Sequence, residues 1–93
     1  MSDSEQEKQA IFLNDIYEEI TFNENQVKNL TFFAMNWLLN IRNKAKEWRN
    51  EPNEYKCVMI EDMIYHYAED EEFQSPLMDN LKLICAQLHT TSQ

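Results

Sequence analysis

The stretch VKNLTFFAMNWLLNIRNKAKEWR, residues 27–49, carries the strongest structural signal in the sequence. Its apolar side chains recur every three or four residues, which is the spacing of one face of an α-helix. This apolar stripe consists of Val27, Leu30, Ala34, Leu38, Ile41, Ala45 and Trp48. Basic residues crowd the last turns, where they oppose the negative end of the helix dipole. We therefore expect one long helix over about residues 24–49, and we expect it to be the central helix of the fold.

A second apolar strip lies on the same segment. Phe32, Met35 and Leu39 are rotated by roughly 100° or more from the first stripe, at about 100° per residue. A helix that is apolar around so much of its girth is either buried at the centre of the fold or part of a dimer interface. Phe32, Met35 and Leu39 are therefore a candidate dimer or adaptor interface.

The rest of the chain is also predicted to be helical. There is no glycine, the commonest residue for turns with positive φ, so tight hairpins are disfavoured. Apolar periodicity predicts further helices over about residues 5–20, 53–72 and 76–89. Ser75 and Pro76 suit the N-cap and first position of the last helix, and Thr21 with Glu24 or Asn23 with Gln26 could cap the second. The expected fold is all-α, a compact bundle of about four helices in a single domain over residues 1–93.

Composition argues against a membrane protein and a secreted protein. The longest strongly apolar run, residues 30–41, is shorter than the roughly 20 residues that span a bilayer. The first nine residues, MSDSEQEKQ, lack the basic and apolar regions of a signal peptide. We expect a cytoplasmic protein, in a bacterial host if it is phage-encoded. Cys57 and Cys85 are then expected to be reduced core thiols, with a disulfide as the minor alternative.

Charge indicates the kind of partner. The net charge is −9, and it is uneven: residues 1–24 and 50–93 are acidic, whereas residues 25–49 carry five bases and one acid. Phosphates would be repelled by most of this surface, so direct binding to nucleic acid is disfavoured. A basic protein would be attracted to it, and quickly.

No pattern of catalytic or metal-binding residues emerges. Asp62, His66 and Glu69 share one predicted helix face, but a solvated acidic face explains them better than a metal site does. Cys57 and Cys85 lie on apolar stripes, where burial suppresses the reactive thiolate. We expect the basic residues of the second helix to oppose the helix dipole and to bridge to acidic neighbours. The sequence therefore predicts no enzyme, no metal and no cofactor.

The acidic segment around residues 61–72 is the candidate partner-binding surface. A solvated helix end is the simplest interpretation of such a run. The alternative is a strip of carboxylates about 5–6 Å apart on a rigid helix, which resembles the phosphates of a nucleic-acid strand. Asp15, Glu18 and Glu19 could extend it. The predicted partner-binding residues are Glu61, Asp62, Tyr65, Glu69, Asp70, Glu71 and Glu72.

The segment EDMIYHYAEDEEFQSP, residues 61–76, resembles the tyrosine-pair, acidic-loop and Ser-Pro segment of colicin DNase immunity proteins. The matching positions are Asp62, Ile64, Tyr65, Glu69, Ser75 and Pro76. The likeness covers about fifteen of the 93 residues and departs at His66, at a proline missing after the aromatic pair, and in the long second helix. The resemblance implies shared interface chemistry, binding of a nuclease through an acidic helix, and not membership of that family.

Two functions follow from these observations. The first is inhibition by binding, in which the acidic surface occupies the nucleic-acid groove of a basic enzyme or complex. A phage anti-defence protein or a nuclease-toxin immunity protein would act in this way. The second is a helical adaptor or assembly subunit that docks through Phe32, Met35 and Leu39.

Overall fold

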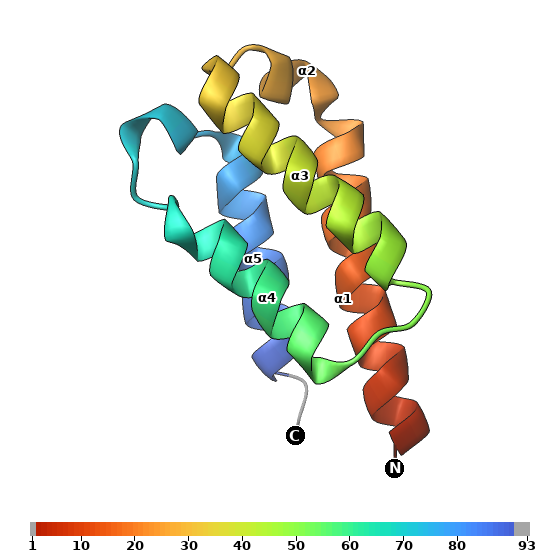
Figure 1. Cartoon of the computed structure of the whole chain (residues 1–93). Coiled ribbons are helices and arrows are strands. Elements are labelled where there is room, and N and C mark those ends of the chain that lie inside the picture. The colour runs from red at the N-terminus through yellow and green to blue at the C-terminus, as the bar shows by residue number, and fades with distance from the viewer. Residues whose placement is uncertain (1, 91–93) are drawn as a thin grey trace.

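The computed structural model describes residues 2–90, with side-chain exposure described for residues 4–89, and it is helical without strands over that range. The all-α prediction is confirmed. The elements are α1 (Ser2–Phe22), α2 (Glu24–Lys28), α3 (Phe32–Trp48), α4 (Glu54–His66), the 3₁₀ turn η1 (Glu71–Phe73) and α5 (Pro76–Thr90) (Figure 1). The radius of gyration of 12.9 Å is close to the ~12 Å expected for a compact chain of this length.

The helix at the centre is α1 and not the segment predicted from the sequence. α1 packs against α3, α4 and α5, whereas α3 packs mainly against α1, α2 and α4 (Figure 1). The physical reason is that α1 buries a continuous apolar face. This face consists of Phe12, Leu13, Ile16 and Ile20, with the amide side chain of Gln9 also buried beside it.

The long helix expected over residues 24–49 is broken at residues 29–31. Asn29 ends α2, and Thr31 adopts an extended backbone with φ −62° and ψ 160°. The Thr31 hydroxyl oxygen then accepts a hydrogen bond of 3.2 Å from the Ala34 amide and caps α3. Val27 and Ala34 are both buried on either side of the break, so the apolar stripe continues although the helix does not.

The helix expected over residues 53–72 ends at His66. The chain turns at residues 67–70 and then forms η1, so the acids at 69–72 lie outside α4. Four carboxylates at a helix C-terminus would face the negative end of its dipole, which explains why the helix ends before them. The turn also inserts Phe73 into the core, where its side chain is 0% exposed.

The start of α5 is capped as predicted, with an unpredicted second contact. The Ser75 hydroxyl oxygen accepts from the Met78 amide at 3.2 Å, and Pro76 opens the helix. The side-chain oxygen of Gln26 accepts from the Leu77 amide at 3.1 Å and so joins α2 to α5. Neither of the two capping pairs expected for the second helix forms a cap there. Thr21 lies within α1, and Asn23 is the N-cap residue of α2 but makes no side-chain cap, although the Gln26 side-chain amide donates to its side-chain oxygen at 3.0 Å.

Candidate functional site

An aromatic cluster fixes the acidic turn between α4 and α5 onto the rest of the molecule. The Phe73 ring stacks on Tyr67 with centroids 5.2 Å apart, and Phe33 of α3 meets both rings edge to face. Trp37 lies edge to face with Tyr67, and its indole N–H donates to the Met63 carbonyl at 2.9 Å. The acids at 69–72 are therefore carried by a turn anchored through the buried Phe73 ring, which packs with the half-buried rings of Tyr67 and Trp37.

Hydrogen bonds between distant segments bring further acids to the same end of the molecule. The Thr31 hydroxyl at the start of α3 donates to a Glu72 carboxylate oxygen at 2.5 Å. The Asn80 amide of α5 donates to a Glu19 carboxylate oxygen of α1 at 2.8 Å. The end of α1, α2, the start of α3, η1 and the start of α5 thus meet (Figure 1). We call this the acidic end; its carboxylates are Glu18, Glu19, Glu24, Glu69, Asp70, Glu71, Glu72 and Asp79.

Few cations oppose the acidic end. Lys28 lies 3.8 Å from Glu24, and Lys82 lies 3.7 Å from Glu69. In each pair the carboxylate is at least half exposed, and surface pairs of this kind contribute roughly 0–1 kcal/mol, so they hold the carboxylates only weakly. Most of the negative charge at this end faces solvent and is available to a partner.

Two exposed phenylalanines lie beside these acids. Phe22 is the last residue of α1 and is 77% exposed, and Phe32 is the first residue of α3 and is 76% exposed. Aromatic side chains within a polar rim are typical of protein interfaces. The acidic end therefore combines negative charge with apolar anchors.

The predicted site residues fall into two groups. Glu69, Asp70, Glu71 and Glu72 are exposed together in the turn and η1. The remaining three lie on α4: Asp62 is exposed, Tyr65 is half-exposed, and Glu61 is drawn inward. The side chain of Glu61 is only 14% exposed, and its carboxylate contacts the His89 ring nitrogen at 2.5 Å. The seven residues do not form one continuous helical strip.

Sequence reasoning did not connect Glu24, Asp79 and Phe22 with this surface. A signal was present, because the acids flank the first and last connections of the chain. When four helices run alternately up and down, these two connections lie at the same end. That topology, combined with the charge pattern, could have predicted the acidic end.

The predicted apolar strip is only partly free. Phe32 is exposed, but Met35 and Leu39 are half-buried and pack against the core. The strip is therefore smaller than expected from helical periodicity. A partner approaching it would meet mainly Phe32.

The basic residues of α3 do not bridge to acids in the way expected. The Arg49 guanidinium lies 4.5 Å from the centroid of the Tyr17 ring and donates to Asn14 at 2.6 Å. Lys46 also lies over Tyr17, and Lys44 lies over Trp48. Within residues 4–89, these cations cover aromatic rings instead of forming salt bridges.

The two cysteines are free and buried, which confirms that they are core thiols. Burial, with a smaller effect of the Glu61 charge, raises the pKa of Cys57 and of Cys85 to about 12. At neutral pH both are therefore thiols and poor nucleophiles.

The Asp62, His66 and Glu69 triplet does not share a helix face, because α4 ends at His66. In the described part of the chain, no group of three or more His, Cys, Asp or Glu side chains could hold a metal ion. The same part contains no helix that is both long and apolar enough to cross a membrane.

Comparison of the chain with known protein families, curated proteins and solved structures found no match. The class that the fold and charge define is a small all-helical protein with an acidic end.

Proposed function

We propose that this protein is an acidic inhibitor that occupies the nucleic-acid-binding groove of a basic enzyme or complex in the cytoplasm. The observation that supports this best is the acidic end, where carboxylates from α1, α2, η1 and α5 converge with few opposing cations. A single DNA strand carries one charge per roughly 3.4 Å of helix axis. A groove built for such a polyanion would accept a dense, solvent-facing array of carboxylates.

The manner in which the array is held favours recognition by a rigid surface. The turn at 67–75 is anchored by Phe73 and tied to α3 through Thr31 and Glu72. A preorganised surface loses less conformational entropy on binding than a flexible acidic tail does. A phage protein acting against a host defence complex, or an immunity protein acting against a nuclease toxin, would act in this way.

In this proposal the predicted residues contribute unequally. Glu69, Asp70, Glu71 and Glu72 are its centre, and Phe22 and Phe32 are added as apolar anchors. Asp62 and Tyr65 extend the surface along α4. Glu61 contributes least, because its carboxylate is paired with His89.

The second candidate is an adaptor or homodimer that docks through the strip of Phe32, Met35 and Leu39. The specific observation in its favour is that a phenylalanine 76% exposed opens α3. Salt is the discriminating condition, because Phe32 belongs to both surfaces and Leu39→Asp would also damage the fold, since Leu39 packs on the core.

Displacement of nucleic acid tests the first candidate. The immobilised protein captures its target from a host lysate, and a fluorescent DNA duplex or RNA is then titrated onto the purified target. We expect the captured target to bind the duplex or the RNA, and the protein to displace it competitively. A target that binds no nucleic acid, or one that stays bound in high salt, would contradict inhibition and support the adaptor.

A further inference from the structure

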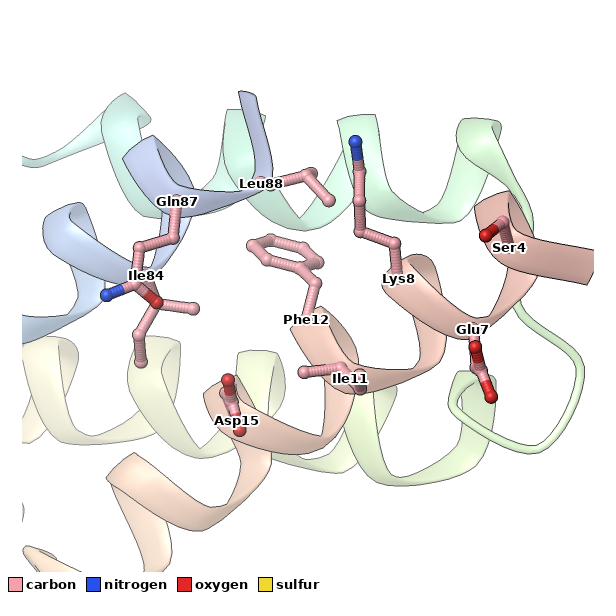
Figure 2. A pocket seen from close by; sticks show the side chains of 9 residues that line it. All are labelled: Ser4, Glu7, Lys8, Ile11, Phe12, Asp15, Ile84, Gln87 and Leu88. Atoms are coloured by element: carbon pink, nitrogen blue, oxygen red, sulfur yellow. The ribbon is translucent and has the colours of Figure 1, made fainter. Parts of the chain in front are cut away.

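An open apolar groove runs between α1 and α5, on a surface that the acidic-end proposal does not use. It encloses about 280 Å³. Figure 2 shows Phe12 of α1 reaching toward Ile84 and Leu88 of α5, with Ile11 at the solvent side. Ile11 is 58% exposed, so a large aliphatic side chain borders the hollow and faces solvent. The groove therefore has an apolar floor with one unburied anchor.

Carboxylates border this groove. Glu7 and Asp15 lie on the α1 side, and the Lys8 ammonium points away from them (Figure 2). Partial burial raises the pKa of Asp15, and the neighbouring charges of Glu18 and Glu19 raise it further. A cation placed beside Asp15 would relieve that unfavourable environment.

Negative charge also borders the other end of the groove. A second hollow shares Lys8 and Leu88 with the first and is lined by Glu5, Glu54 and Glu61. The combined surface has apolar side chains along its length and carboxylates toward both ends, with Lys8 between the two hollows and Glu61 paired with His89. Its complement is a segment with apolar side chains in the middle and cations at both ends.

We propose that the α1–α5 groove binds a cationic amphipathic helix of a partner protein. A helix laid along a groove between two helices presents apolar residues every three or four positions, and these would fill the floor beside Ile11. Lysine or arginine side chains on its flanks would reach Asp15 and Glu7 on one side and the second hollow on the other. A second copy of this chain fits less well, because Glu7, Asp15 and Glu18 of both copies would be brought together.

The test uses a model peptide of leucine and lysine, about 14 residues long, which forms roughly four turns of helix at 3.6 residues per turn. Its affinity is measured by calorimetry, and its site is located from the methyl resonances of Ile11, Ile84 and Leu88. A peptide with glutamate in place of lysine is the charge control. Sedimentation of the free protein reports self-association.

Matched variants separate the groove from general attraction to an acidic protein. Ile11→Gln is compared with Leu83→Gln, because Leu83 is 62% exposed but does not line the groove. Asp15→Asn is compared with Asp79→Asn. We expect Ile11→Gln to weaken binding about tenfold and Asp15→Asn several-fold, with both controls within about twofold.

Variants at the acidic end distinguish failure of the groove proposal from failure of the acidic-end proposal. Amides at Glu69, Asp70 and Glu71 are expected to leave peptide binding within about twofold of the wild type. Equal losses of peptide affinity in Ile11→Gln and Leu83→Gln, or methyl shifts confined to the acidic end, would overturn the proposal that the groove binds the peptide. So would a dimer that Ile11→Gln dissociates, or the absence of saturable binding.

Discussion

The charged side chains at the two ends of the molecule make different contacts. At the acidic end, eight carboxylates converge, and within residues 4–89 the cations paired with them are the exposed Lys28 and the half-buried Lys82. At the opposite end of α3, Lys44, Lys46 and Arg49 lie over the rings of Trp48 and Tyr17. The basic groups therefore stabilise the fold directly, whereas most of the acidic groups face solvent.

This difference indicates which charges are available for recognition. A cation over an aromatic ring contributes about 0.5–1 kcal/mol at an exposed site, so its removal destabilises the protein. A solvent-facing carboxylate among like charges contributes nothing favourable to folding, so its removal is neutral or stabilising. A cluster of such residues is consistent with selection for binding and not for stability.

The largest expected effect concerns the anchor of the acidic end. Phe73→Ala removes a fully buried ring that stacks on Tyr67, and we expect a loss of about 3–5 kcal/mol in the free energy of unfolding. Phe32→Ala is the control, with an expected loss within about 0.5 kcal/mol because Phe32 is exposed. Urea unfolding measures both. Similar values for the two variants would show that the turn is not anchored.

A smaller change in the free energy of unfolding is expected at the break before α3. Thr31→Val removes the cap at the Ala34 amide and the contact with Glu72, and we expect a loss of about 1 kcal/mol. Thr21→Val is the control, because the Thr21 hydroxyl is buried without a hydrogen-bond partner in the described structure. We expect Thr21→Val to leave the free energy of unfolding unchanged or to raise it. A larger cost for Thr21→Val than for Thr31→Val would contradict the observed cap.

Neutralising one charge at each end compares the two regions directly. Arg49→Met removes the contact with Tyr17 and the hydrogen bond to Asn14, and we expect it to cost about 1 kcal/mol. Asp70→Asn is expected to be neutral or slightly stabilising. Thermal unfolding at low ionic strength measures both. A cost for Asp70→Asn equal to that of Arg49→Met would remove the difference between the ends.

The smallest expected effect is at Asp15 and depends on pH. Because the pKa of Asp15 is raised in the folded state, the ionised form is disfavoured there, and stability is lost as pH rises above the ordinary value of 3.8. Asp15→Asn should therefore raise the melting temperature at neutral pH. Well below pH 3.8 both side chains are neutral in both states, and the gain should vanish. A gain that persists in acid would have another cause.

Much of the fold could be predicted from the sequence because it depends on local patterns. The apolar stripe from Val27 to Ala45 is buried as expected except at Leu30, which is half-buried, and Ser75 caps α5. The break at Thr31 could not be found by periodicity, since residues 27 and 34 stay in phase across it. The end of α4 could have been predicted from the helix dipole, which disfavours four acids at a C-terminus.

The site was harder to predict, because it depends on contacts between distant segments. Phe73 stands in an acidic run and carries no periodic signal, yet it is fully buried. Glu61 falls in the same run but is paired with His89, a residue 28 positions away. Which carboxylates face solvent together is therefore decided by packing and not by sequence proximity.

The most direct measurement is the affinity of the captured target for two variants of equal charge. One carries Glu69→Gln, Asp70→Asn and Glu71→Gln, which leaves the Thr31–Glu72 contact intact, and the other carries Glu47→Gln, Glu51→Gln and Glu54→Gln. At about 0.15 M salt, the first should bind at least about tenfold more weakly than the wild type, and the second within about twofold. Equal affinities for the two variants would contradict recognition through the acidic end.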